Sequence, residues 1–333
     1  MARHPAFMPV VRGIDLAAHT GMNTSTSYLG MRLAHPFIAG ASPYGYRVET
    51  IRRLEDAGCA AVVLHSLFEE QISGAVSPFP DRSEYPFGPD DYAAHVDRAK
   101  RAVAIPIIAS INGHRATSWL SFAPLIEQAG ADALELNVYN VPAEPHLSGA
   151  DIEAHVVAMV RELKRCVRIP VAVKVSPFFT AFGHFARQLD EAGADGLVLF
   201  NRFYQPDIDI RTMSMSPQAD LSTNAELPLR LRWMAVLCGR VRPSLALSGG
   251  VAEPHDGIKA ILAGADVVQL VSALLRHGPA HVALMRSALE RWLEWHQMVT
   301  VDEARGAVSL KGTADGESFE RAQYINTLHS WVG

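Results

Sequence analysis

A short apolar run that carries one lysine decides the fold: Ile169-Pro170-Val171-Ala172-Val173-Lys174-Val175-Ser176-Pro177. Valine-rich runs of this length are typical of buried strands, so we expect a strand over 171–175. Lysine is rarely fully buried unless it is paired, and Lys174 therefore needs an anionic or polar partner. One interpretation is an ion-paired core lysine, or one that reaches solvent at a strand end. The other is a functional lysine at the mouth of a parallel barrel, where it meets an electron-rich cofactor or forms a Schiff base.

This run is one of eight apolar segments that alternate with helical patterns. We expect strands at 35–42, 60–64, 106–111, 131–136, 171–175, 196–200, 245–247 and 267–271, and helices at 48–57, 92–103, 118–129, 151–166, 181–192, 227–238, 253–263 and 279–295. Such alternation predicts a parallel sheet. Eight units within about 260 residues favour a closed (β/α)8 TIM barrel, of the α/β class, over an open doubly wound sheet.

Both ends of the chain extend beyond the predicted barrel. We expect an N-terminal extension over 1–33, the barrel over 34–296 and a C-terminal tail over 297–333. The tail carries Phe319, Tyr324 and Trp331, which predict packing on the barrel. Contact with a partner is the alternative for these aromatic residues.

Four helix-to-strand joints look alike, and we expect them to be structural. In each, a glycine follows the helix and takes a left-handed conformation, and small neighbours let the chain turn tightly into the barrel floor. The joints are Ala57-Gly58-Cys59-Ala60, Ala129-Gly130-Ala131-Asp132, Ala192-Gly193-Ala194-Asp195 and Ala263-Gly264-Ala265-Asp266.

Composition excludes several classes of protein. A net charge of −5 gives no electrostatic support for nucleic-acid binding. Cys59, Cys166 and Cys238 are scattered and form no CxxC motif, so we expect no iron–sulfur cluster, no metal site and no disulfide. This cysteine usage fits a reducing cytosol, and we expect a cytoplasmic protein. No apolar run reaches about 18 residues, so we expect no membrane span.

Polar and small residues follow most of the predicted strands. Active sites of parallel barrels are built at the carboxyl ends of the strands, where these residues would lie. An asparagine amide both donates and accepts, which suits a flat heterocycle, although each asparagine alone also fits a strand-end turn. Glycines after the seventh strand and a serine after the eighth fit a phosphate cradle, or a plain turn. The strand-end residues are Ser42, Ser66, Asn112, Asn137, Lys174, Asn201, Gly249, Gly250 and Ser272.

Several of these residues lie in motifs that resemble the dihydroorotate dehydrogenase family of FMN barrels over residues 24–295. The motifs are Pro36-Phe37-Ile38-Ala39-Gly40-Ala41-Ser42, Glu135-Leu136-Asn137, Asn140-Val141-Pro142, Val173-Lys174-Val175, Asn201, Leu247-Ser248-Gly249-Gly250-Val251 and Gln269-Leu270-Val271-Ser272-Ala273-Leu274. The resemblance implies FMN as cofactor, with Lys174 beside the pyrimidine side of the flavin ring. It also implies that Asn137 and Asn201 contact flavin or substrate, and that Gly249, Gly250 and Ser272 hold the phosphate.

The chain departs from that family in three places. The family loop after the fourth strand runs Asn-x-Ser-Cys-Pro-Asn-x-Pro with Cys or Ser as the base, whereas here it runs Asn137-Val138-Tyr139-Asn140-Val141-Pro142. The lysine that often follows the second strand is replaced by His65, and the glycine before the last phosphate-binding hydroxyl by Val271. The retained motifs therefore predict FMN binding, and the missing base predicts inefficient oxidation of dihydroorotate.

The leading hypothesis is an FMN-dependent oxidoreductase acting on CH–CH groups of a small, planar, pyrimidine-like substrate, which would place the protein in pyrimidine metabolism. Candidate bases are Tyr139, His146 and His114, each of which also fits a packed or solvated loop residue, and a tyrosine ordinarily has a pKa of about 10. Candidate catalytic residues are thus Lys174, Tyr139 and His146, and Asn137, Asn140 and Asn201 would bind substrate.

Two other hypotheses and two partners stay open. Lys174 and the phosphate cradle also fit a Schiff-base aldolase or lyase. The missing base also fits a flavin-binding subunit that has lost catalysis. Without an iron–sulfur motif, electrons would pass to a separate electron-transfer partner, and a homodimer is the other assembly left open.

Overall fold

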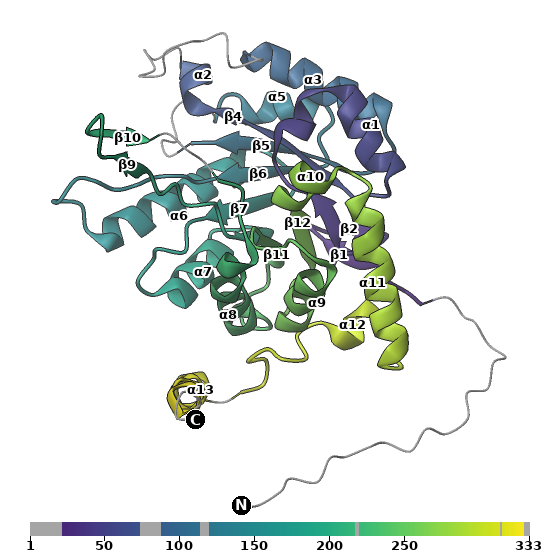
Figure 1. Cartoon of the computed structure of the whole chain (residues 1–333). Helices are drawn as coiled ribbons and strands as arrows, with labels where there is room; N and C mark the ends of the chain where they lie inside the picture. The colour runs from purple at the N-terminus through teal and green to yellow at the C-terminus, as the bar shows by residue number, and fades with distance from the viewer. Residues whose placement is uncertain (1–21, 74–87, 114–119, 217–219, 314, 330–333) are drawn as a thin grey trace, which may run out of the picture.

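The computed structural model is a closed barrel of eight parallel strands surrounded by helices (Figure 1), which confirms the predicted fold class. It describes residues 22–73, 88–113, 120–216, 220–313 and 315–329. The strands follow one another around the barrel in chain order, and the last pairs with the first. They are β3 (Phe37–Ala39), β4 (Val62–Phe68), β5 (Ile107–Asn112), β6 (Ala133–Asn137), β7 (Val171–Val175), β8 (Gly196–Leu199), β11 (Ser244–Ser248) and β12 (Val267–Leu270).

Helices on the outside of the barrel bury their apolar faces against the strands, and the main core lies between the two layers. The outer helices are α1 (Val48–Asp56), α3 (Pro89–Ala102), α5 (Ala123–Gln128), α6 (Gly149–Cys166), α7 (Phe182–Glu191), α8 (Leu227–Leu237), α9 (Pro254–Ala263) and α11 (His281–Trp295). The short helices α2 (Glu69–Ser73) and α10 (Ser272–His277) were not predicted. No helix within the described ranges is long and apolar enough to cross a bilayer.

The predicted second strand, 60–64, has the wrong bounds. β4 runs from Val62 to Phe68, so His65 and Ser66 lie inside the strand and not after it. The pairing of β4 with β5 shifts register between Val63 and Ser66. After this shift β4 pairs with β5 as far as Phe68, and it therefore extends beyond the predicted end at Leu64.

An unpredicted hairpin of β1 (Thr26–Tyr28) and β2 (Met31–Leu33) closes the amino-terminal end of the barrel. Tyr28 and Leu29 are buried in a second core cluster with strand residues such as Ile38 and Val198. A Cβ at Gly196 would lie 2.6 Å from the Leu29 side chain, so the glycine makes room for this plug.

The repeated joints confirm the left-handed glycines: Gly58, Gly130, Gly193 and Gly264 have φ of 86°, 89°, 98° and 119°. The aspartates that follow three of them have an additional role. Each carboxylate accepts a backbone N–H at 2.7 Å from the first or second residue of the preceding strand, and each pairs with a cation. The cation–aspartate pairs are Lys100–Asp132, Lys164–Asp195 and Arg305–Asp266.

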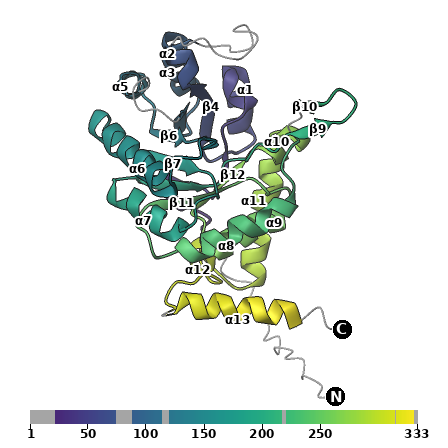
Figure 2. The same cartoon turned by 90° about the vertical axis from the view of Figure 1, so that its left-hand side faces the viewer.

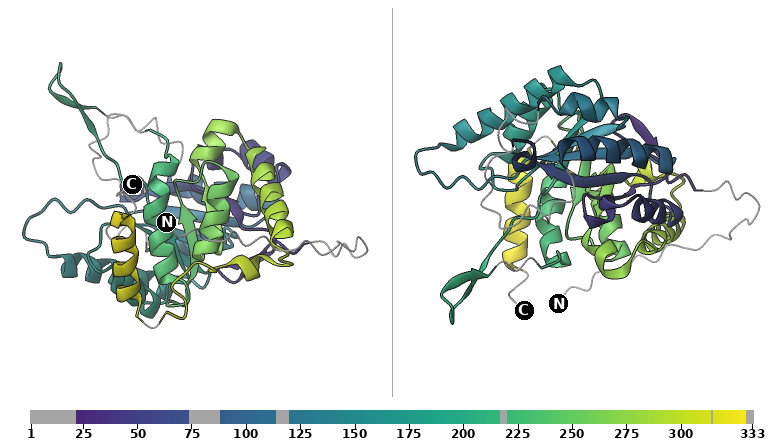
Figure 3. Two further views of the ribbon diagram at one scale, coloured as in Figure 1. Left: turned by 60° about the horizontal axis from the view of Figure 1, so that its bottom comes forward. Right: turned by 90° about the horizontal axis from the view of Figure 1, so that it is seen from above.

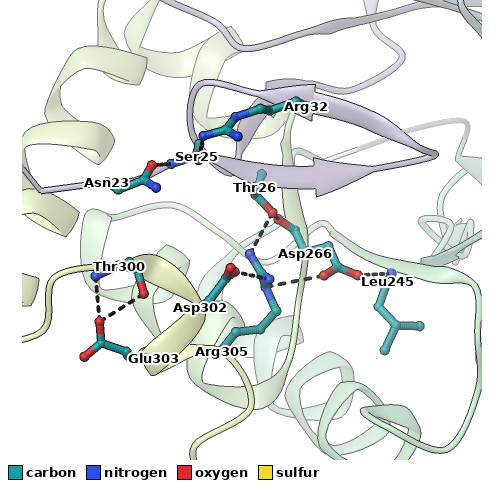
Figure 4. A network of polar contacts seen from close by, with 10 residues as sticks. All are labelled: Asn23, Ser25, Thr26, Arg32, Leu245, Asp266, Thr300, Asp302, Glu303 and Arg305. Atoms are coloured by element: carbon teal, nitrogen blue, oxygen red, sulfur yellow. Dashed lines mark hydrogen bonds and ion pairs between the residues drawn. The ribbon is translucent and has the colours of Figure 1, made fainter.

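The C-terminal segment begins in close contact with the barrel. Val301 and Ala304 of α12 (Val301–Ala304) are fully buried. Arg305 donates to Thr26 of the floor hairpin at 2.7 Å and lies 3.4 Å from Asp266, which ties the hairpin and the segment around α12 to the joint before β12 (Figure 4).

The final helix, α13 (Gly316–His329), lies along the outside of the molecule (Figure 2) and has no buried residue. Phe319 and Tyr324, expected to pack on the barrel, are 44% and 53% exposed, and Trp331 lies outside the described residues. An ion pair between Glu320 and Arg232 of α8 links the helix to the barrel.

A second unpredicted hairpin, β9 (Asp207–Asp209) with β10 (Ser214–Ser216), lies in the long loop after β8 and projects away from the barrel (Figure 3). Its apolar side chains are exposed, among them Ile210 at 88% and Met213 at 89%. No strand was predicted between 200 and 245, because the Asp, Ser, Met and Pro content of this loop carries no strand signal.

Candidate active site

Three predicted residues form a row across neighbouring strands. In the barrel register Asn112 of β5 pairs with Asn137 of β6, and Asn137 pairs with Lys174 of β7. Paired residues of parallel strands point to the same face, and Lys174 contacts other side chains inside the barrel, so the row lies on the inner face at the carboxyl ends of the strands. We call Asn112, Asn137 and Lys174 the polar row.

Lys174 has the partners that its burial requires. Its side chain is 8% exposed, and its Nζ lies 3.5 Å from Glu135 Oε1 and 3.3 Å from Gln269 Oε1. Gln269 Nε2 donates to Glu135 Oε2 at 2.6 Å. The sequence predicted a partner for Lys174 but not which residue. The signal was present, because Glu135 lies two residues before Asn137 and period-two alternation places both on one face of β6.

Asn137 leaves one polar atom without a partner. Its Oδ1 is buried and accepts no hydrogen bond in the described structure. Buried acceptors are nearly always satisfied, so this oxygen points to a donor from a bound molecule.

Asn201 is close to the polar row but binds backbone. Its Nδ2 donates to the carbonyl oxygens of Val138 at 2.8 Å and Lys174 at 3.4 Å, and its own N–H donates to Val175. Asn201 therefore holds the ends of β6 and β7 together.

The predicted phosphate cradle is brought together, with one additional residue. Ser222 Oγ accepts the N–H of Gly250 at 3.3 Å and donates to Ser272 Oγ at 2.9 Å, and the Ser222 N–H donates to the same oxygen at 3.0 Å. Ser222 thus links the loop after β11 to α10. No pattern in the loop distinguished this serine from its neighbours, so sequence reasoning missed it.

Two arginines support the cradle and were also missed. Arg276 donates to the carbonyl oxygens of Leu221 and Ser222 at 2.9 and 2.8 Å. Arg230, which is 4% exposed, donates from Nε to the Ser248 carbonyl at 2.6 Å. Burial lowers the pKa of Arg230, and its ion pair with Glu226 partly offsets that effect.

The glycines of the cradle are required by close packing. Gly249 and Gly250 have φ of 85° and 78°, which disfavours other residues. A Cβ at Gly250 would also lie 2.8 Å from the backbone nitrogen of Leu227, and one at Gly249 2.9 Å from Arg230.

The remaining predicted residues lie around this group. Ser66 Oγ is 2.8 Å from Ser110 Oγ, and Ser42 is buried at the start of the 3-10 helix η1 (Pro43–Tyr46). His65 contacts the Gly45 carbonyl from Nδ1 at 3.2 Å, and burial lowers its pKa to about 4. His65 is therefore uncharged at neutral pH.

The loop after β6 does not bring its candidate base to the polar row. Tyr139 accepts the N–H of Tyr204 at 3.1 Å, which joins this loop to the loop after β8. Asn140 is exposed, and the His146 side chain is 75% exposed and lies 3.9 Å from Glu144. Neither has a described hydrogen bond or ion pair to the row, and His114 lies outside the described residues.

A cavity of about 540 Å³ lies away from this group, between α1 and α3. Its lining includes Arg47, Arg52, Arg98 and Arg101 and none of the predicted site residues. The polar row and the cradle, and not this cavity, define the candidate active site.

Comparison with known proteins places the chain in a family. The family model for dihydroorotate dehydrogenase matches residues 87–293. The chain is 28% identical over 300 residues to the catalytic subunit of dihydroorotate dehydrogenase B (NAD(+)) from Thermoplasma volcanium, covering 84% of this chain and 94% of that protein. It is 22% identical over 346 residues to the chloroplastic dihydropyrimidine dehydrogenase (NADP(+)) of Arabidopsis thaliana, covering 90% and 81%. It is 25% identical over 303 residues to PreA, a subunit of the NAD-dependent dihydropyrimidine dehydrogenase of Escherichia coli, covering 81% and 72%. Since the family match spans more than half of the chain, this protein belongs to the dihydroorotate dehydrogenase family and is an oxidoreductase.

Proposed function

We propose that this protein is an FMN-dependent oxidoreductase that acts on a small, planar, pyrimidine-like substrate at the mouth of the barrel. The observation that carries the proposal is the polar row at the carboxyl ends of the strands, in which the buried Asn137 Oδ1 has no partner among the described residues. The names of the relatives include both dihydroorotate and dihydropyrimidine dehydrogenases, which supports the pyrimidine-like class.

The residues present fit the cofactor. A flat ring with N–H and C=O groups would give Asn137 Oδ1 its missing donor, and asparagine amides suit such a ring. Ser222 Oγ already stands between the Gly250 N–H and Ser272 Oγ, the kind of donor set that binds phosphate oxygens.

Each residue of the site then has a role. Gly249, Gly250 and Ser272 would hold the phosphate, with Ser222 beside them. Ser42, Ser66, Asn112, Asn137 and Asn201 would surround the ring and the substrate. Lys174 would place a positive charge beside the pyrimidine end of the flavin, which favours the anionic reduced form. FMN itself supplies the hydride chemistry when bound.

The loop after β6 bears on which substrate of this class the protein uses. No Cys or Ser stands where the resemblance implies a base, and His146 is exposed. Oxidation of a CH–CH group requires a proton to leave the substrate, so a positioned base matters for rate. We therefore infer that dihydroorotate is a poor substrate, and that the true substrate either needs no such base or meets Tyr139 or a loop histidine, His146 or His114, only once it is bound.

Two alternatives make different predictions. A Schiff-base mechanism needs a Lys174 amine that is free to attack a carbonyl, whereas Lys174 Nζ lies 3.5 Å from Glu135 Oε1 and 3.3 Å from Gln269 Oε1. A flavin subunit without catalysis would bind FMN, but no dihydropyrimidine would reduce that FMN.

Since PreA is named a subunit and the Thermoplasma protein a catalytic subunit, a separate electron-transfer partner is part of the proposal.

The test is the visible spectrum and FMN affinity of the purified protein. We expect a flavin spectrum, or uptake of added FMN, and at least tenfold weaker binding in Ser272→Ala. The control is Ser318→Ala on exposed α13, which should bind FMN as the unsubstituted protein does. A colourless protein that takes up no FMN would refute the proposal.

A further inference from the structure

Glu135, Gln269 and Lys174 form a closed triad inside the barrel. Each of the three side chains contacts the other two, at 2.6, 3.3 and 3.5 Å. Glu135 is fully buried, and Gln269 and Lys174 are buried as well. The two carboxylate oxygens are thus divided between an amide donor and a cation.

Neighbouring residues in the described part of the barrel leave space for this triad and add no charge of their own to it. A Cβ at Gly40 of the β3 end would lie 3.3 Å from Gln269 Oε1 and 2.7 Å from the Val271 side chain, so the glycine makes room for the amide. Burial raises the pKa of Tyr28 and of Tyr92, and the charge of Glu135 contributes to both shifts. Both phenols therefore remain neutral, and Lys174 is the cation that the described structure places within ion-pair distance of Glu135.

The triad has a direction along the barrel. Glu135 precedes Asn137 by two residues on β6, and a strand rises about 3.3 Å per residue, so the carboxylate residue lies deeper than the polar row. Lys174 pairs with Asn137 and lies at the level of the row. A group bound at the mouth would therefore lie closer to Lys174 than to Glu135, which lies deeper in the barrel.

We propose that Glu135 is a positioning residue that fixes the Lys174 ammonium at the polar row and offsets part of its charge, which lowers the reduction potential of a bound flavin. This inference rests on the proposed function. Charges a few Å apart interact strongly in a barrel interior, so a carboxylate behind the lysine weakens the field that stabilises an anionic reduced ring. Gln269 fixes the carboxylate by donating to its other oxygen.

The experiment measures the flavin reduction potential in two variants. Glu135→Gln keeps the shape and removes the charge. The double variant Glu135→Gln with Gln269→Glu returns one carboxylate to a position that also contacts Lys174. We expect Glu135→Gln to favour reduced over oxidised FMN at least tenfold more than the unsubstituted protein does, a rise of about 30 mV for a two-electron couple. The double variant should return toward the original potential.

The control is Glu290→Gln, the same chemical change on the outside of α11, which should leave the potential unchanged. Uptake of FMN with equal potentials in the unsubstituted protein and Glu135→Gln would overturn this inference alone. If the reduction potential of the double variant stays as high as that of Glu135→Gln, the inference is also overturned. An effect of the carboxylate charge should reverse when the carboxylate is returned beside Lys174, whereas a merely structural effect should not. Failure of the unsubstituted protein to take up FMN would instead refute the proposed function, and this inference with it.

Discussion

Lys174 and Glu135 form a buried ion pair, so removing one partner should leave the other as an unpaired buried charge, which destabilises the folded state. Glu135 is fully buried, and Lys174→Met would leave its charge without a cation. Breaking a buried pair in this way typically costs about 3–5 kcal/mol of unfolding free energy, whereas replacing both members costs much less. We expect urea unfolding to show that loss in Lys174→Met and a smaller one in Lys174→Met with Glu135→Gln.

The exposed pair Arg101–Asp97 is the matched control, because surface pairs contribute about 0–1 kcal/mol. Arg101→Met should change the unfolding free energy by no more than that. Equal destabilisation in the single and double variants of the buried pair would contradict the account of Lys174.

The lowered pKa of His65 predicts that the folded protein loses stability in mild acid. Burial lowers its pKa to about 4 from the ordinary 6.5, so the unfolded chain takes up a proton below pH 6.5 that the folded chain does not. Stability attributable to His65 is therefore complete above pH 6.5 and is lost as the pH falls toward 4, by about 3 kcal/mol. His35 and His95, whose pKa values burial also lowers, add in the same direction.

The measurement is the urea midpoint between pH 7 and 4.5. His65→Gln should show a shallower dependence than the unsubstituted protein, and His255→Gln, exposed on α9, an unaltered one. An equally steep dependence in His65→Gln would show that His65 does not carry the effect.

How much of the site could be predicted depended on whether a residue lay at a strand end. Asn112, Asn137 and Lys174 could be predicted, because alternation and strand order fix where the end of each strand lies. Ser222 and Arg230 come from a loop and a helix, and only tertiary packing brings Ser222 to Gly250 and Arg230 to Ser248. The exact partner of Lys174 required the barrel register as well.

At the scale of elements, the two parts of the C-terminal segment differ in how they are held. Truncation after Thr313 removes α13, which has no buried residue, and should change the melting temperature by less than about 2 °C. Truncation after Met298 also removes the buried Val301 and Leu310 and the Arg305–Asp266 pair, and should cost at least about 3 kcal/mol.

Differential scanning calorimetry of both truncations tests this division. Equal melting temperatures for the two would show that α12 does not stabilise the barrel. A large loss on removing α13 alone would show that its exposed side chains, such as Phe319, are buried in an assembly.

Most elements of the barrel could be predicted because each strand is a short apolar run and each outer helix has its own apolar face. The errors lie where tertiary contacts override local pattern. β4 continues past Leu64 because a register shift allows it to pair with β5 as far as Phe68. The floor hairpin forms because Tyr28 and Leu29 have an open barrel end to fill, a partner that no local pattern reveals.

At the scale of the whole molecule, the chain combines a barrel whose strand-end residues fit the proposed FMN site with a loop after β6 that departs from the family pattern. The register aligns Asn112, Asn137 and Lys174, and the ends of β11 and β12 meet through Ser222. The loop after β6 carries Tyr139 and Asn140 in place of the Cys–Pro pair of the family that it resembles. The framework and the loop therefore predict separable properties, retention of FMN and slow reaction with dihydroorotate.

The most direct test is anaerobic stopped-flow mixing of the FMN-loaded protein with dihydroorotate, followed by loss of the flavin absorption band. Loss of a positioned base costs about 10²–10⁴-fold in rate, so we predict that the band bleaches at least about 100-fold more slowly than in a relative that carries the base. Dithionite should bleach the same sample completely, which shows that the flavin is reducible. Bleaching by dihydroorotate as fast as in that relative would contradict the account, because Tyr139 or a neighbouring residue would then be acting as the base.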